Sequence, residues 1–283
     1  MATGLVLEGG ALRGLFTSGI IDVFLENNIK FDCAVGVSAG VVFGTNLKSH
    51  QCGRGIRYNL KYSGYWKYKS FRSLILTGDL FGAEFCYHKL PNELDRFDSE
   101  VFRNDPMDFY SVVTDCETGE PFYKKLTDGG YEDLEWVRAS ASMPLASKIV
   151  SIGGRKYLDG GISDSIPLRF MEDQGFKRNV VILTQPEDYV KQPYKIMPIV
   201  KTVLHGYPEL VKSVGNRHVM YNEQTKYVKT REAEGAAFVI RPESALNIKP
   251  TEKDPDELKR VYDHGVAVGN KVLADLKTFL SDS

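Results

Sequence analysis

The pattern of apolar and polar positions near the start of the chain changes from that of a strand to that of a helix and back. Residues 4–7 form a short apolar run that indicates a strand, and a glycine-rich loop at 8–14 follows it. Apolar side chains at 15–24 then recur at helical spacing, and asparagines at 27–28 can end that helix because asparagine tolerates the left-handed conformation. A second strand at 32–37, built around the apolar run 33–35, completes a βαβ unit, which predicts two parallel strands joined by a right-handed crossover.

The later pattern predicts further strands up to residue 183 and mostly helices after it. Glycines at 153–154 lie between two strand-like runs, 149–152 and 155–158, which is typical of a hairpin. Asp254 and Pro255 begin a long C-terminal helix, since aspartate is a preferred N-cap and proline a preferred first residue. The other expected elements are strands at 109–114, 121–126, 178–183 and 236–240, a helix at 132–142, and mainly helical structure at 198–233.

No repeat, linker or low-complexity tract interrupts the 283 residues. With 42% hydrophobic and 26% charged residues, the composition is typical of a globular protein with a substantial core. We therefore expect one α/β domain over residues 1–283. The net charge of -1 gives no general attraction to nucleic acid, so we expect no nucleic-acid partner, and the sequence does not indicate an oligomeric state.

The chain begins without a basic segment followed by a long apolar run, so we expect no signal peptide. Its longest uncharged stretch, Cys33 to Leu47, is too short and too rich in glycine to span a membrane. The four cysteines are far apart and form no Cys-x-x-Cys pair, which favours reduced thiols. Together these features predict a cytoplasmic protein.

The sequence from Gly36 to Gly40, Gly-Val-Ser-Ala-Gly, has the form of a nucleophile elbow. It lies between a predicted strand and a predicted helix, which is the context that such an elbow requires. Small residues beside Ser38 permit the tight turn, and the following helix end offers N–H groups to a developing oxyanion. A strand-to-helix turn with a capping serine would have the same sequence, so the pentapeptide alone leaves both interpretations open.

The glycine-rich loop at 8–14 fits neither common phosphate-binding motif. Gly9 and Gly14 have the spacing of a P-loop, but Leu15 stands where lysine is needed. A dinucleotide fingerprint would need glycine in place of Ala11. The alternative is an oxyanion hole built from the N–H groups of Gly9, Gly10 and Ala11, with Arg13 fixing the loop or binding an anion.

A nucleophilic serine needs a base, and the chain offers two kinds. Three histidines follow Ser38 in the order of an α/β-hydrolase triad, but that fold has several more strands before its elbow. Asp159 ends a predicted strand and is followed by Gly160 and Gly161, so its carboxylate could approach a serine closely. The histidines of the alternative triad are His205, His218 and His264.

Three segments together resemble the motifs of patatin-like phospholipases in order and spacing. They are residues 8–14 (Glu-Gly-Gly-Ala-Leu-Arg-Gly), the pentapeptide at 36–40, and Asp-Gly-Gly at 159–161. The segment 139–144 also resembles the stretch that the family carries before its aspartate, and the whole resemblance covers residues 4 to 185. One departure is Ala11, where the family usually has glycine, which brings the loop geometry into question but not the number of N–H donors.

The resemblance implies a three-layer α/β/α fold with a mainly parallel central sheet and the elbow after the second strand. It implies a Ser38–Asp159 dyad that hydrolyses lipid acyl esters without a metal or cofactor, in a protein of the bacterial, cytoplasmic kind. Residues 190–283, which carry no recognised motif, would complete the domain. The oxyanion-loop positions are Gly9, Gly10, Ala11, Arg13 and Gly14, and the supporting glycines are Gly36, Gly40, Gly160 and Gly161.

Two weaker signals remain. The interval from Tyr58 to Arg72 mixes aromatic and basic residues outside the sheet, which suits either a cap over the core or peripheral contact with the inner face of a membrane. His50, Cys52, Cys86 and His88 offer the ligand set of a zinc site, but their spacing is tighter than usual. A lipid-binding or acyl-binding module with little turnover is the alternative to an enzyme, although the intact Ser38 and Asp159 argue against it.

Overall fold

The computed structural model describes residues 2–281, and these residues form one eight-stranded sheet. Its centre consists of five strands with parallel pairing, as predicted. In spatial order they are β3 (Asp108–Asp115), β2 (Cys33–Val37), β1 (Thr3–Leu7), β7 (Arg178–Ile182) and β8 (Ala237–Ile240). Three antiparallel strands, β4 (Pro121–Leu126), β5 (Val150–Ile152) and β6 (Arg155–Asp159), extend the sheet at the β3 side.

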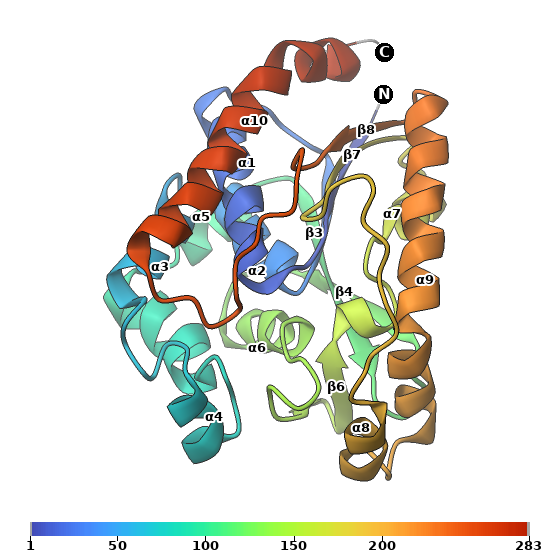
Figure 1. Cartoon of the computed structure of the whole chain (residues 1–283). Coiled ribbons are helices and arrows are strands. Elements are labelled where there is room, and N and C mark those ends of the chain that lie inside the picture. The colour runs from blue at the N-terminus through green and yellow to red at the C-terminus, as the bar shows by residue number, and fades with distance from the viewer. Residues whose placement is uncertain (1, 282–283) are drawn as a thin grey trace.

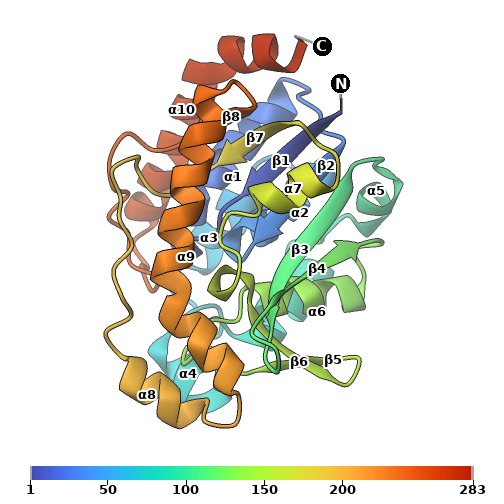
Figure 2. The same ribbon diagram turned by 90° about the vertical axis from the view of Figure 1, so that its right-hand side faces the viewer.

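Helices cover both faces of the sheet, which explains why the central strands are apolar without alternation. Leu5 and Leu7 of β1 pack into one hydrophobic cluster, whereas Val6 packs into another on the opposite face. Figures 1 and 2 show the resulting three layers. The first face carries α1 (Gly14–Glu26), α2 (Ala39–Lys48), α6 (Tyr131–Ser140) and α10 (Pro255–Ser281), and the second carries α7 (Leu168–Asp173) and α9 (Pro208–Ala233).

The C-terminal helix α10 packs closely on α1 through glycine. A Cβ atom built on Gly265 would lie 2.0 Å from the carbonyl oxygen of Phe16, and one on Gly19 would lie 2.3 Å from that of Tyr262. Only glycine permits the two backbones to approach so closely, so the packing of α10 on α1 requires glycine at both positions. The N-terminal and C-terminal thirds of the chain therefore share one packed layer.

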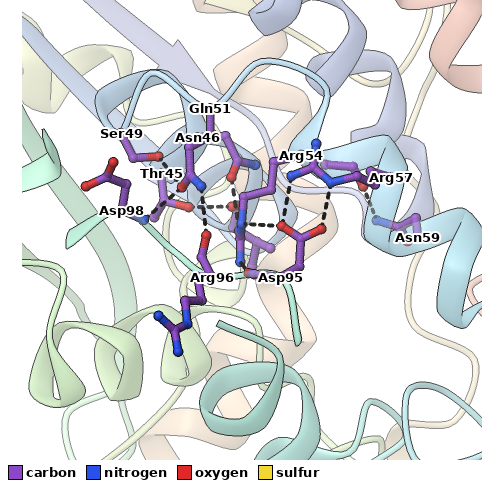
Figure 3. A network of polar contacts seen from close by, with 12 residues as sticks. Thr45, Asn46, Ser49, Gln51, Arg54, Arg57, Asn59, Asp95, Arg96 and Asp98 are labelled. Atoms are coloured by element: carbon purple, nitrogen blue, oxygen red, sulfur yellow. Dashed lines mark hydrogen bonds and ion pairs between the residues drawn. The ribbon is translucent and has the colours of Figure 1, made fainter. Parts of the chain in front are cut away.

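Residues 49–107 lie outside the sheet and form a cap of short helices, which includes the interval Tyr58–Arg72 that the sequence predicts to lie outside it. They are α3 (Arg54–Tyr62), α4 (Phe71–Thr77), a π-helical segment η2 (Phe85–Leu94) and α5 (Ser99–Asn104). A polar network fixes the two ends of the cap to each other (Figure 3). In it, both oxygens of Asp95 accept hydrogen bonds from Arg57 at 2.8 Å, while Arg54 bonds to Asn46 at 3.1 Å and to the Asp95 carbonyl at 2.8 Å.

Several predicted boundaries differ in detail from the structure. The helix predicted after the elbow begins at Ala39, directly after Ser38, which occupies its N-cap position. The helical region near 198–233 is divided into α8 (Met197–Val203) and α9, with a turn between them. Asn28 has φ +53°, so the predicted left-handed helix end is confirmed. Within residues 2–281 no helix combines the length and apolar character needed to cross a bilayer.

Candidate active site

Ser38 occupies a strained turn between β2 and α2. Its φ of +53° and ψ of -121° lie in a region that residues other than glycine rarely adopt. The flanking glycines are needed for contact reasons, since a Cβ on Gly36 would lie 2.6 Å from the backbone nitrogen of Val41. One on Gly40 would lie 2.3 Å from the carbonyl oxygen of Leu7. The turn therefore holds the serine hydroxyl at the carboxyl edge of the sheet, as the sequence predicts for a nucleophile elbow.

Ser38 and Asp159 come together because two strands end against each other along β3. On one edge of β3, β2 runs parallel and ends with Val37 opposite Val112. β6 runs antiparallel and ends with Asp159 opposite Val113, the next residue of β3. Because β4 occupies the other edge at these positions, β2 and β6 share one edge and meet at their carboxyl ends. Residues more than a hundred positions apart in the sequence are thus adjacent.

The segment after α6 bridges the two residues. The Ser38 N–H donates a hydrogen bond to Ser140 Oγ at 2.9 Å, and the Asp159 N–H donates one to the carbonyl oxygen of Ser142 at 2.8 Å. Ser140 is fully buried, so this support is isolated from water. The structure thus gives a physical role to the Ser140 hydroxyl and to the Ser142 backbone carbonyl in the segment 139–144.

Burial dominates the electrostatics of Asp159, whose side chain is almost inaccessible to solvent. Burial raises the pKa of its carboxyl above the ordinary value, and Arg217, the Ser38 hydroxyl, the Gly161 N–H and Lys191 each lower that pKa in part. Oδ1 accepts a hydrogen bond from the Gly161 N–H at 2.8 Å. Oδ2 has no hydrogen-bond partner of standard geometry within residues 2–281. Oδ2 is therefore the oxygen of Asp159 that remains available to the Ser38 hydroxyl. A hydrogen bond between a catalytic pair often reaches its full strength only when the substrate is bound.

The loop at 8–14 lies directly against the serine. A Cβ on Gly9 would approach Ser38 Cβ to 2.8 Å, and one on Gly14 would approach Ala39 Cβ to the same distance. The backbone N–H groups of Gly9, Gly10 and Ala11 donate to no acceptor in the described part of the chain. Ala11 has φ +48°, so alanine adopts here the left-handed conformation that glycine would take at lower cost.

Glu8 anchors the start of this loop. Its carboxylate is buried and accepts hydrogen bonds from the Tyr221 hydroxyl at 2.7 Å and from the Thr184 N–H at 2.6 Å. The Thr184 hydroxyl in turn donates to the Gly9 carbonyl at 3.0 Å. These contacts tie the loop to the strand ends and to α9.

A cavity of about 450 Å³ opens above these groups. Ser38, Asp159, the 9–13 loop and Gly161 line it, and the cap at 49–107 contributes part of its apolar wall. This wall accounts for some of the aromatic residues in the Tyr58–Arg72 interval, because Tyr58 and Tyr68 are buried and line the cavity. Other apolar wall residues are Phe43, Phe81, Leu90 and Val137.

The histidines lie apart from this cavity, because none of the residues that line it within 2–281 is a histidine. His205 and His218 instead contact carbonyl oxygens within their own helical segments, and His264 packs edge-on against Phe16. The two histidines considered for zinc bind other partners instead. His50 is hydrogen-bonded to Asp105 at 2.6 Å, and His88 is hydrogen-bonded to Glu135 at 2.9 Å. Among residues 2–281 no group of three or more potential ligands gathers.

Comparison with known proteins identifies the family. The family model described as patatin-like phospholipase matches residues 5–171, which is more than half of the chain. The chain belongs to the patatin-like phospholipase family. This membership supports a lipid-hydrolysing enzyme, and it confirms the resemblance carried by the three motifs. A second family model, a domain of unknown function (DUF6363), matches residues 207–281, which include α9, β8 and α10.

Individual relatives of this patatin-like protein are distant. The uncharacterized protein YjjU of Escherichia coli is 27% identical over 290 aligned positions, which cover 98% of this chain and 79% of YjjU. Lysophospholipase NTE1 of Debaryomyces hansenii is 25% identical over 188 positions, covering 64% of this chain but 12% of that protein. Among solved structures, VipD from Legionella pneumophila matches with a TM-score of 0.48 and 13% identity, over 97% of this chain and 67% of VipD.

The residues that the sequence did not indicate come mainly from beyond the patatin match. Lys191 follows β7, and Arg217 and Tyr221 lie on α9, yet all three line the cavity of the patatin motifs. Arg217 Nε donates a hydrogen bond to the Gly161 carbonyl at 2.6 Å. No local pattern marks these residues, since each is a single polar residue in an ordinary helix or loop.

Proposed function

We propose that this protein is a serine hydrolase of lipid acyl esters, with Ser38 as nucleophile and Asp159 as its base. The observation that carries the proposal is the meeting of β2 and β6 along one edge of β3, opposite Val112 and Val113. It sets the strained serine beside a buried carboxylate with one free oxygen. The apolar cavity above them suits an acyl chain.

In this mechanism Asp159 accepts the proton of the Ser38 hydroxyl while the serine oxygen attacks the ester carbonyl. The N–H groups of Gly9, Gly10 and Ala11 stabilise the oxyanion, because they have no acceptor of their own in the described residues. The tetrahedral intermediate collapses to an acyl-serine, and Asp159 returns the proton to the departing alcohol. Water, deprotonated by Asp159, then attacks the acyl-serine and releases the fatty acid with regeneration of the Ser38 hydroxyl.

Two alternatives predict different behaviour. A binding module with little turnover would need no activated serine, whereas the positive φ of Ser38 is a strain that a passive turn does not require. A Ser-Asp-His triad would need a histidine at the cavity of Ser38, and none of His205, His218 and His264 lines it, although His218 lines a neighbouring cavity.

A fluorophosphonate probe tests the proposal, since labelling requires an activated serine. We expect labelling of the wild type, none of Ser38→Ala, and strongly reduced labelling of Asp159→Asn. His205→Ala, His218→Ala and His264→Ala serve as matched controls and should be labelled like the wild type. Full esterase activity in Ser38→Ala would refute the assignment, and a loss of about 10⁴ in one histidine variant would establish a triad instead.

We further propose that residues 190–283 belong to the same domain as the motifs, so that 1–283 is one hydrolase domain. The parallel pairing of β8 with β7 supports this, as does the glycine contact between α10 and α1. Helix α9 also contributes Arg217 and Tyr221 to the lining of the cavity that contains Ser38. The domain of unknown function would then complete the lipase rather than act separately.

We also propose that the enzyme meets its lipid at a membrane surface through α4 and α8. Both helices expose apolar side chains, with Phe71 68%, Ile75 82% and Ile199 53% accessible to solvent. Leu80 and Tyr194, close to these helices in sequence, line the cavity. In Figures 1 and 2 α4 and α8 lie at the same end of the molecule, opposite the termini. Exposed Lys67, Arg72, Lys195 and Lys201 would suit anionic headgroups.

A further inference from the structure

We propose that Arg13, Lys191 and Arg217 form an anion-binding subsite that holds the phosphate of a glycerophospholipid or lysophospholipid beside the scissile ester. The three residues come from the oxyanion loop, the segment after β7 and helix α9, and all line the cavity that contains Ser38. The inference rests on the proposed function and names its substrate class, an acyl ester that carries a phosphate group.

None of the three cations forms an ion pair with a carboxylate of the described residues, although Glu8 and Asp159 act on Lys191 from a longer range. Within residues 2–281 no carboxylate oxygen lies within 4.0 Å of any of their side-chain nitrogens, and Arg13 Nε is buried without a hydrogen-bond partner. Lys191 Nζ lies over the ring of Tyr221, 4.3 Å from its centre, and forms no hydrogen bond with the described residues. By contrast, Arg231 at the far end of α9 is paired with Glu172 at 2.6 Å.

The two acidic groups of the cavity are already committed. Glu8 accepts hydrogen bonds from Tyr221 and Thr184, and Asp159 accepts one from Gly161. The cations therefore face the cavity in excess. Burial lowers the pKa of Lys191 to about 8, and the like charges of Arg217 and Arg13 lower it further, whereas Glu8 and Asp159 raise it in part.

The position of the cations suits a headgroup rather than an acyl chain. Arg13 lies two residues after Ala11, the last of the loop N–H donors, and Arg217 binds the carbonyl of Gly161, two residues after Asp159. Lys191 and Arg217 also line a second cavity of about 270 Å³, with His218 and Tyr194, that could receive the remainder of the headgroup. An arginine–phosphate contact of this kind is charge-assisted and geometrically specific.

The test compares two substrates with the same acyl chain, a lysophosphatidate and the matching neutral monoacylglycerol. Lys191→Met is the informative variant, because the Lys191 side chain makes no hydrogen bond that the fold would lose. We expect kcat/KM for the lysophosphatidate to fall about 10- to 100-fold, and at least tenfold more than for the monoacylglycerol. Lys226→Met, an exposed lysine on α9 that lines neither cavity, is the control and should change neither value.

Inhibition distinguishes a phosphate subsite from a site for the released fatty acid. Dodecyl phosphate and laurate, which share a chain length, are compared as inhibitors of monoacylglycerol hydrolysis. We expect Lys191→Met to weaken inhibition by dodecyl phosphate selectively, whereas equal weakening for laurate would overturn the phosphate assignment. An equal loss on both substrates in Lys191→Met would also overturn it, while leaving the proposed function intact. Unchanged hydrolysis in Ser38→Ala would instead remove the proposed function itself.

Discussion

The backbone N–H of Ser38 is held by the hydroxyl of Ser140, 2.9 Å away and fully buried. The hydrogen bond joins the strained elbow to the end of α6, and the next turn of the same segment holds the N–H of Asp159 through the carbonyl of Ser142. One short segment thus sets the positions of both residues of the proposed dyad. Support of this kind is what keeps a strained serine in its turn.

Ser140→Ala should therefore loosen the elbow. Without an acceptor for the Ser38 N–H, we expect a stability loss of about 1–3 kcal/mol and slower fluorophosphonate labelling. Ser142→Ala is the matched control, because Asp159 contacts the Ser142 carbonyl and the lost hydroxyl bonds only to Arg138. Thermal unfolding and labelling rates measure both effects. Equal labelling rates in the two variants would contradict the positioning role of Ser140.

Asp159→Asn should abolish turnover and yet stabilise the protein at neutral pH. The folded-state pKa of Asp159 lies above its unfolded value of about 4, because burial disfavours the charge. The ionisation of Asp159 therefore lowers the free energy of unfolding at pH values above the folded-state pKa. This loss of stability disappears at pH values below the pKa of the unfolded state. Asparagine retains an oxygen for the Gly161 N–H. The melting temperature of Asp159→Asn should thus be higher than that of the wild type at pH 7, and the two should converge near pH 4. A lower melting temperature of the variant at pH 7 would contradict a destabilising buried charge on Asp159.

The same raised pKa predicts the acid limb of the activity profile. A base must be deprotonated to accept the Ser38 proton, so kcat/KM should fall as the pH drops through the pKa of Asp159. The midpoint is expected above the ordinary aspartate value, because burial raises this pKa. A profile measured on a neutral short-chain ester avoids titration of the substrate. A midpoint below the ordinary value would show that the working base is another group.

Much of this site could be predicted from the sequence, because its key parts are local. The elbow, the glycine-rich loop and the hairpin before Asp159 each depend on residues close in the chain, and the strands are apolar because both sheet faces are buried. The support from Ser140 and the cations Lys191 and Arg217 depend on packing between segments far apart. Nor does a sequence pattern mark the π-helical η2 or the short α7, since both rely on tertiary contacts rather than on periodicity.

Gly9→Ala should displace the oxyanion loop from the serine. The added Cβ would lie 2.8 Å from Ser38 Cβ and 2.9 Å from the Val37 carbonyl oxygen, so the loop or the elbow must shift. A displacement of that size is expected to lower kcat/KM about 100-fold. Ala11→Gly in the same loop keeps the N–H donor and relieves the positive φ, so its effect should be far smaller. Similar losses in both variants would indicate that the loop does not act through its contact with Ser38.

Gly265→Ala tests whether the C-terminal region is part of one domain. Its methyl group would meet the Phe16 carbonyl at 2.0 Å and separate α10 from α1, at a cost of about 1–3 kcal/mol. Gly206→Ala is the control, because nothing lies within 4 Å of its added methyl. Circular dichroism and loss of activity on heating should give coincident single transitions in the wild type and in Gly265→Ala. A first transition that removes helix but leaves activity would show that α10 folds separately.

The membrane surface is tested by placing charge on α4. Ile75 and Leu76 are 82% and 62% exposed, so the double change to aspartate should leave the fold intact. Because a lipid surface would have to accept two buried carboxylates, we expect reduced sedimentation with anionic liposomes and lower activity on vesicle substrates. Activity on a dissolved short-chain ester should persist, since neither side chain lines the cavity. Val219→Asp, at an exposed apolar position on α9, is the matched control. If the α4 variant sediments with liposomes as well as Val219→Asp does, the enzyme does not dock through this helix.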